Sequence, residues 1–367
     1  MDHLRCRPLL LSLLLLLLCS VAIASSFGGG AEPDEDPLIL QVVDREKDGL
    51  TLNEEAHFTS FMRRFGKTYA DEEERTHRLK VFKANLRRAA RHQRLDPTAV
   101  HGITKFSDLT PAEFRRAYLG LRRRTPASSH QAPVLPTNDL PTDFDWRDYG
   151  AVTGVKNQVL YLQAGPFAAG ALEGAHFLAT GKLESLSEQQ LVDCDHMCDS
   201  DEPDACDQGC NGGLMTTAFQ YILKSGGLER EEDYPYTGSQ HGTCKFDKSK
   251  IAASVHNFSV VSIDEDQIAA NLVKLGINAV YMQTYIGGVS CPYICGRHLD
   301  HGVLLVGYGS AGYSPIRLKE KPFWLIKNSW GENWGEKGYY KICRGRNVCG
   351  VDSMVSTVTA IHPQQDE

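Results

Sequence analysis

Residues 300–309 read Asp-His-Gly-Val-Leu-Leu-Val-Gly-Tyr-Gly, and residues 328–340 read Asn-Ser-Trp-Gly-Glu-Asn-Trp-Gly-Glu-Lys-Gly-Tyr-Tyr. The apolar run in the first segment is typical of a β-strand and places His301 at the start of that strand. A single histidine is more often structural than catalytic. The second segment, with two Trp-Gly pairs followed by Gly-Tyr-Tyr, is far more distinctive. Together the two segments decide the fold class.

Both segments resemble the histidine and asparagine segments of papain-like cysteine proteases. The resemblance implies that the Asn328 amide orients the imidazole of His301 and that Trp330 shields their hydrogen bond from water. Gln158, in Val-Lys-Asn-Gln at 155–158, matches the residue whose side-chain amide lines the oxyanion hole in this family. A thiol protease needs a thiolate, an imidazole, an orienting group and oxyanion donors. Three of these four are therefore present.

The segment after Gln158 departs from the family pattern. That pattern places Cys-Gly-Ser/Ala-Cys-Trp/Tyr near the mature N-terminus, whereas residues 159–169 read Val-Leu-Tyr-Leu-Gln-Ala-Gly-Pro-Phe-Ala-Ala. Counting forward from Gln158 places the nucleophile at Ala164, and counting back from Gly170 places it at Gln163. Neither side chain can attack a carbonyl, so the sequence predicts no peptide hydrolysis. Residues 170–180 should still form the central helix, with Gly-Pro in its first turn.

The number of cysteines agrees with the loss of the family's cysteine-containing signature after Gln158. Nine of the 11 lie beyond the first 24 residues, and an odd number in a secreted chain needs an explanation. The family resemblance implies four disulfides: Cys194–Cys244, Cys198–Cys206, Cys291–Cys343 and Cys295–Cys349. It leaves Cys210 unpaired, because Tyr161 stands where its usual partner would be. A zinc site formed by Cys194, Cys198, Cys206 and Cys210 is the alternative, but a secreted chain favours disulfides. No metal or cofactor is expected.

A second departure follows residues 268–274, which have a helical pattern. The family continues such a helix into a Gly-Pro turn and an apolar strand of the substrate wall, whereas here residues 275–280 lead directly to Tyr281. Roughly ten residues are missing, about two strands' length, which puts the fold of this half in doubt. Both departures are abrupt, which favours a gene-model or splicing artefact over an evolved inactive protein.

Residues 57–118 have helical periodicity. Apolar residues repeat along one predicted helix at Phe58, Phe61, Met62 and Phe65, and along a second at Leu79, Phe82, Leu86 and Ala89. The second helix resembles the Glu-Arg-Phe-Asn motif of papain-family propeptides, in the Ala/Gln variant of the cathepsin F-like plant branch: Glu74, Arg78, Phe82, Asn85, Ala89 and Gln93. Residues 102–108, Gly-Ile-Thr-Lys-Phe-Ser-Asp, resemble the second propeptide motif. An inhibitory propeptide is predicted over residues 57–118.

The N-terminus resembles a signal peptide. An apolar run at 9–18 follows Arg5 and Arg7, and small residues at 22–24 suit cleavage, so we assign residues 1–24 to it. The run is too short to span a membrane. We predict a flexible leader at 25–56, a linker with the processing site at 119–139, and a peptidase domain at 140–367. The destination is the secretory pathway, then vacuole, lysosome or extracellular space.

Charge is divided along the chain. Residues 1–138 hold 21 Lys and Arg against 17 Asp and Glu, whereas residues 139–367 hold 18 against 29. This division favours electrostatic pairing of the two halves over nucleic-acid binding, because the acidic remainder would repel phosphate. The expected partners are peptide or protein substrates, the chain's own propeptide and cystatin-type inhibitors, with no nucleic acid, no membrane and a monomeric state.

The resemblance implies a two-subdomain α+β fold, with a helical half from about Trp146 and a β-barrel-like half carrying His301 and Asn328. The resemblance predicts a papain-like endopeptidase zymogen that acts in an acidic compartment. The absence of the nucleophilic cysteine predicts that this chain is inactive. The alternative is a non-catalytic protein that binds peptides or inhibitors. Asn257, in Asn-Phe-Ser, is a predicted glycosylation acceptor. His298 is given no role.

Overall fold

The computed structural model describes residues 53–121, 131–158, 165–199, 206–209, 212–239, 243–271, 273–311 and 321–361. The predicted signal peptide and most of the predicted leader lie outside these residues, as do Tyr161, Gln163, Ala164 and Cys210. Residues 53–121 are called the prosegment below, and residues 140–361 the C-terminal region. Within the described parts, no helix is both long and apolar enough to cross a membrane.

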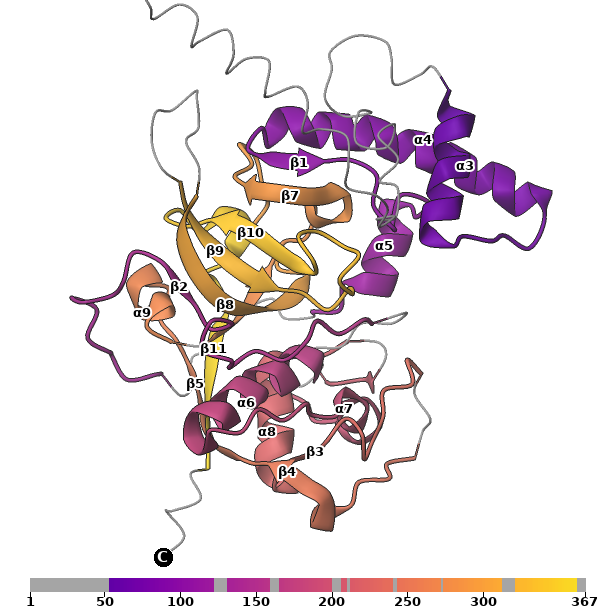
Figure 1. The fold of residues 1–367 in the computed structure, drawn as a ribbon. Coiled ribbons are helices and arrows are strands. Elements are labelled where there is room, and N and C mark those ends of the chain that lie inside the picture. The colour runs from indigo at the N-terminus through magenta and orange to yellow at the C-terminus, as the bar shows by residue number, and fades with distance from the viewer. Residues whose placement is uncertain are drawn as a thin grey trace, which may run out of the picture. The chain divides into compact units, whose positions relative to one another are not determined.

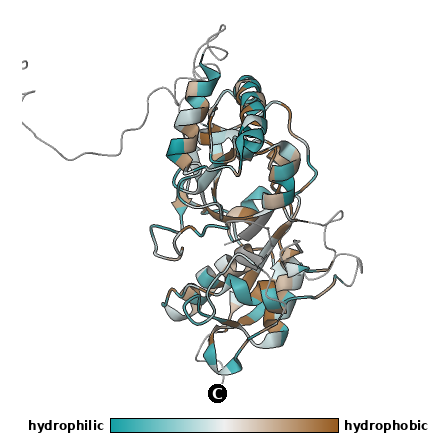
Figure 2. Ribbon diagram, turned by 90° about the vertical axis from the view of Figure 1, so that its right-hand side faces the viewer, coloured by the Kyte–Doolittle hydropathy of each residue, from teal (hydrophilic) through white to brown (hydrophobic). Residues whose placement is uncertain are grey.

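The prosegment consists of helices α3 (Glu54–Phe65), α4 (Glu72–Leu95) and α5 (Pro111–Tyr118), with the strand β1 (Ala99–His101) between the last two. The two predicted amphipathic helices are confirmed, and the first begins three residues before the expected start. Helix α4 is largely hydrophilic (teal in Figure 2), and its N-cap is Asp71, whose side chain accepts a hydrogen bond from the Glu74 amide at 2.8 Å. Its apolar face packs on α3 through buried Phe58 and Phe82, whose ring centroids are 5.3 Å apart.

The helical half of the C-terminal region contains α6 (Gly165–Thr180), α7 (Glu188–Cys194) and α8 (Met215–Ser225). A short antiparallel pair, β3 (Leu228–Glu229) and β4 (Ile251–Ala253), and the 3-10 helix η3 (Lys248–Lys250) complete it. The predicted central helix is α6, and Pro166 lies in its first turn, where a missing amide costs no helical hydrogen bond. Small side chains on α6, such as Ala168 and Ala169, are fully buried among its neighbours.

The other half is built on one mixed sheet (Figure 1). Its strands from this region are β2 (Phe144–Asp145), β5 (Val255–Val260), β6 (Val273–Ile277), β7 (Tyr285–Ser290), β8 (His301–Ala311), β9 (Lys321–Lys327), β10 (Tyr339–Cys343) and β11 (Val355–Ala360). The order is β1-β7-β10-β9-β8-β6-β11-β5, and β2 pairs with β8. Because β1 and β5 lie at opposite ends of this order, the predicted β-barrel-like half is an open sheet. Short helices α9 (Glu265–Ala269), η4 (Met282–Thr284) and η5 (Val348–Gly350) connect the strands.

Strand β6 corrects two expectations. The helix predicted over 268–274 ends at Ala269, and residues 273–277 form a strand between β8 and β11. The strand expected to be missing is therefore present, and its first two residues belong to the segment that was predicted to be helical. Its position explains the change: Lys274 to Ile277 pair antiparallel with Leu304 to His301, and the sheet supplies hydrogen-bond partners on both edges that a short helix could not replace.

The structure contains the four expected disulfides, Cys194–Cys244, Cys198–Cys206, Cys291–Cys343 and Cys295–Cys349. Two lie in the helical half and two near the β7 and β10 ends of the sheet. All cysteines in the described ranges are therefore paired with one another, without the zinc cluster considered above. The expected orphan, Cys210, lies outside the described residues.

Candidate active site

His301 is the first residue of β8, and Asn328 follows the last residue of β9, its sheet neighbour. Adjacent antiparallel strands bring the two side chains together: His301 Nε2 lies 3.0 Å from Asn328 Oδ1, and both residues are buried. Because an amide oxygen only accepts, Nε2 carries the ring proton in the neutral form. The lone pair is then on Nδ1, which has no hydrogen-bond partner among the described residues.

Aromatic rings hold the imidazole in place. Trp330 stacks on the His301 ring with centroids 4.8 Å apart and planes 22° apart, and Phe167 of α6 meets the ring nearly edge-on at 5.5 Å. Trp330 is itself fully buried and packs against Trp334. This agrees with the expected shielding of the His301–Asn328 hydrogen bond from water. Removal from water lowers the pKa of His301 to about 4, although its bond to Asn328 acts in the opposite direction.

Gln158 is fixed beside the asparagine segment. Its backbone amide donates to the Ser329 carbonyl at 2.9 Å, and its side-chain oxygen accepts from the Ser329 hydroxyl at 2.6 Å. These contacts turn the amide nitrogen Nε2 away from Ser329, and it has no acceptor among the described residues. A buried donor without a partner is rare and costly. Such a donor can stabilise negative charge that develops on a bound carbonyl oxygen.

The end of the prosegment lies against the residue that precedes His301. The amide of Leu121 donates to the carbonyl of Asp300 at 3.2 Å, and the amide of Gly213 donates to the carbonyl of Gly120 at 3.1 Å. Gly212 has a φ of +98°, and a Cβ atom at this position would collide with the Gly120 carbonyl. The Gly-Gly pair thus permits the close approach of two backbones.

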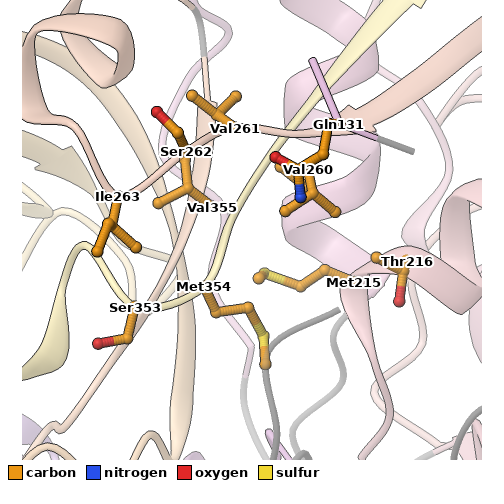
Figure 3. Close-up of a pocket in the computed structure, with 11 residues that line it drawn as sticks. Gln131, Met215, Thr216, Val260, Val261, Ser262, Ile263, Ser353, Met354 and Val355 are labelled. Carbon is orange, nitrogen blue, oxygen red and sulfur yellow. The ribbon is translucent and has the colours of Figure 1, made fainter. Parts of the chain in front are cut away.

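The Leu121 side chain is buried against Met215 and Leu299, with Met354 packed on the same group. The same two methionines line a separate cavity of 220 Å³ with Gln131 and Val260 (Figure 3). These contacts differ from the prediction, which assigned residues 119–139 to a linker. At the linker's other end, Ala132 also donates to the Val260 carbonyl at 2.8 Å. The sequence signal for these contacts was the pair of apolar residues Leu119 and Leu121, which flank Gly120 directly after a predicted helix.

The propeptide-like motif residues hold the segment that faces the site. Arg78 bridges the Asp108 carbonyl and the Glu113 carboxylate at 3.1 and 2.9 Å. Asn85 is buried and donates to the carbonyls of Ser107 and Leu109 at 2.7 and 2.8 Å. The motif on α4 therefore fixes the loop over residues 104–109.

That loop in turn covers the site. Phe106 meets Trp330 edge-on at 5.3 Å, and Lys105 donates to the Trp330 carbonyl at 2.6 Å. Phe114 of α5 contacts the same tryptophan at 5.4 Å. The prosegment therefore covers the tryptophan that stacks on His301.

Comparison with known proteins agrees with this geometry. Residues 140–359 match the papain family cysteine protease profile, and residues 58–114 match the cathepsin propeptide inhibitor domain (I29). The chain is 68% identical to cysteine proteinase 1 of Zea mays, over 96% of this chain and 99% of that protein. It is 67% identical to the probable cysteine protease RD19B of Arabidopsis thaliana, over 89% and 92% respectively.

A solved structure supports the same assignment. Procathepsin L2 from the larval midgut of Tenebrio molitor superposes with a TM-score of 0.71 at 32% identity, covering 83% of this chain and 99% of that one. Fold, site geometry and sequence agree: the chain belongs to the papain family of cysteine proteases and carries the family's propeptide inhibitor domain.

Proposed function

We propose that this chain folds as the zymogen of a papain-family endopeptidase but cannot perform the hydrolytic step, because it has no thiolate beside His301. One observation carries the proposal: the His301–Asn328 pair is assembled with Nδ1 unpartnered, while each cysteine in the described residues is in a disulfide. An imidazole and an oxyanion donor without a nucleophile cannot form an acyl-enzyme.

The residues at the two positions expected for the catalytic cysteine also support the absence of hydrolysis. Both Ala164 and Gln163 lie just before α6, where the family places its nucleophile at a helix N-terminus. A thiol at that end of the helix would have a lowered pKa. A methyl group or a neutral amide has no ionisable proton to give to His301. Cys210 is the remaining cysteine beyond the predicted signal peptide. An experiment must therefore distinguish a reaction at Cys210 from a reaction at position 163 or 164.

The test uses the full chain, exposed to acid and then assayed with a fluorogenic peptide and an epoxide thiol trap. We expect neither turnover nor labelling from the natural sequence. The variants Ala164→Cys and Gln163→Cys decide which position faces His301, because only a correctly placed thiol should become labelled. Cys210→Ser is the matched control, and it should change nothing. Thiol-dependent turnover by the natural chain would refute the proposal, and its loss in Cys210→Ser would identify the unexpected nucleophile.

A second candidate, a non-catalytic binding protein, is favoured by the site that holds Leu121. Its apolar wall of Met215 and Leu299 and the backbone acceptor of Asp300 are intact. Release of the prosegment would leave these groups to bind a peptide or a cystatin-type inhibitor. Measuring inhibitor binding by calorimetry, after cleavage of the linker by an added protease, tests this function. Absence of binding by a folded, processed chain would exclude it.

The remaining assignments extend the proposal. A signal peptide at 1–24 and processing before Leu140 would deliver the chain, as a monomer, to a vacuole, lysosome or the extracellular space. Asn257 lies exposed on β5, which leaves its side chain accessible to a glycan. Mass spectrometry of secreted protein, before and after treatment with a glycosidase, would test the N-terminus and the glycan together. An unprocessed, cytosolic product would contradict both assignments.

A further inference from the structure

A chain of buried polar groups joins the prosegment to the C-terminal region at a distance from the cleft. His92 of α4 and His101 of β1 both approach the hydroxyl of Thr284 in η4, through their Nδ1 atoms at 2.8 and 3.0 Å. On its other side, His101 Nε2 lies 3.0 Å from the carboxylate of Asp96. These groups are all buried, and His101 and Asp96 are completely so. Two histidines thus share one hydroxyl across the interface.

Hydrogen-bonding capacity fixes where the protons are. The Asp96 carboxylate also accepts from the Ser290 hydroxyl at 2.5 Å and from the Cys291 amide at 2.6 Å, so it acts only as an acceptor. His101 must then carry its proton on Nε2, which leaves Nδ1 to accept from Thr284. Thr284 has one hydrogen to give, and therefore accepts from Nδ1 of His92. At neutral pH the chain is complete when both rings are uncharged.

We propose that His92 is the acid sensor of the prosegment, and that protonation of its buried ring weakens the docking of β1 and the α4 end on η4 and β7. This inference rests on the proposed zymogen organisation, but it does not depend on whether the chain can cleave peptides.

The two rings differ in what surrounds them. His101 lies beside the Asp96 carboxylate, and Thr284 could turn its hydrogen from His101 to the Tyr281 carbonyl at 3.3 Å. A charged His92 has no such arrangement. Among the described residues, no carboxylate forms a hydrogen bond or ion pair with its ring, whose neighbours are His101, the Tyr281 ring at 4.6 Å and the cations Arg88 and Arg91. A positive charge on His92 is therefore the charge that the docked interface accommodates least.

Burial, reinforced by His101, Arg88 and Arg91, lowers the pKa of His92 from 6.5 to about 3. A released prosegment would return this ring to water and to its ordinary pKa. The contribution to docking is thus fully present above pH 6.5 and is lost as the pH falls from 6.5 towards 3. Linkage between these two pKa values predicts roughly 30-fold weaker docking at pH 5 than at pH 7.5.

Hydrogen exchange on the full chain can measure this loss. The amides of Gly102 and Val289 donate across the interface, to the carbonyls of Thr284 and Thr98 at 2.8 and 3.1 Å. After correction for intrinsic rates, we expect their protection to fall roughly 30-fold between pH 7.5 and pH 5. The Trp146 amide, bonded to Val306 within the C-terminal region, is the internal reference.

Two variants separate the sensor from other titrating groups. In His92→Gln, whose amide can still donate to Thr284 but does not titrate, the loss of protection should shrink to a few-fold. His77→Gln, which removes an exposed histidine from the same helix, should behave like the natural chain. An undiminished loss in His92→Gln would overturn the proposal and point to the carboxylates of the interface.

If the interface amides of His92→Gln are already unprotected at pH 7.5, a measurement on the natural chain can still test the proposal. Exchange of the ring C2 proton, followed by mass spectrometry, gives the pKa of each histidine in the intact protein. A His92 value well below 6.5 supports the sensor, and an ordinary value overturns it. The intact mass recorded in the same spectra shows whether the chain cleaves itself at pH 5. Failure of the predicted inactivity is therefore distinguishable from failure of the sensor.

Discussion

Lys156, two residues before Gln158, is the centre of a buried ionic cluster behind the candidate site. Its ammonium donates to the Leu186 carbonyl at 2.7 Å and lies 3.3 Å from the Glu173 carboxylate and 3.7 Å from that of Glu188. The two glutamate side chains are only 1% and 3% exposed. Burial alone would lower the pKa of Lys156, but the surrounding carboxylates outweigh it and raise that pKa.

We predict that Lys156→Met destabilises the folded chain strongly at neutral pH. It leaves two buried carboxylates without their nearest cation, and removing one partner from a buried ion pair costs about 3–5 kcal/mol. For a chain of this size the melting temperature should fall by on the order of 10 °C. The loss should shrink at pH 5, because burial already raises the pKa of Glu188 to about 7, and without Lys156 that carboxyl takes up a proton more readily.

Thermal unfolding followed by circular dichroism at pH 7.5 and pH 5 measures both effects. The matched control is Lys250→Met, because the Lys250–Asp233 pair is long, at 3.9 Å, with side chains 48% and 30% exposed. An exposed pair of this kind contributes roughly 0–1 kcal/mol, so the control should barely move the transition. If Lys156→Met were no worse than the control, or worse at pH 5 than at pH 7.5, this account of the cluster would be wrong.

Three further predictions use the same full chain. Glu188→Gln should raise the melting temperature at pH 7.5 and change it little at pH 5. The pKa of Glu188 is about 7 in the folded chain, so its ionisation opposes folding as the pH rises above the ordinary pKa of a glutamate. A lower melting temperature at pH 7.5 would contradict this. Replacing both cysteines of Cys295–Cys349 by serine should cost about 4 kcal/mol in urea unfolding, against about 2.5 kcal/mol for Cys198–Cys206, since the bridges span 54 and 8 residues; the reverse order would refute the loop-length argument. Leu121→Ala should speed hydrogen exchange at the Gly213 amide, because the side chain that holds the prosegment against Met215 is removed; unchanged exchange would show that the backbone contacts suffice.

The sequence predicted the parts of the site that are set by local structure. His301 begins a strand and Asn328 directly follows the neighbouring one, so a recognised apolar run and a recognised motif were enough to place both side chains. The prosegment helices were predicted for the same reason: α4 has its cap, its charged first turn and its apolar face within one continuous segment. The pairing of cysteines followed from the resemblance to the family.

The sequence failed where distant contacts decide the structure. Residues 273 and 274 were predicted to end a helix, but residues 273–277 form β6 because they pair with β8 on one side and β11 on the other. The apolar residues around Gly120 do not reveal what Leu121 contacts, since its partners Asp300 and Gly213 are distant in the sequence. The role of Thr284 between two histidines of the prosegment is likewise invisible until β1 has paired with β7.

The assembly of the His301–Asn328 pair follows from the residues that support it. Trp330, which stacks on the imidazole, belongs to the same buried cluster as Trp334 and Trp324, so the sheet cannot pack without placing this ring. Asn328 lies next to Lys327, whose ammonium donates at 2.8 Å to Thr153, which in turn contacts Glu173 of the ionic cluster. The geometry of the pair is therefore maintained by folding, whether or not chemistry follows. An intact dyad in such a structure is evidence for the fold, and only a thiol within reach of His301 Nδ1 would make it evidence for hydrolysis.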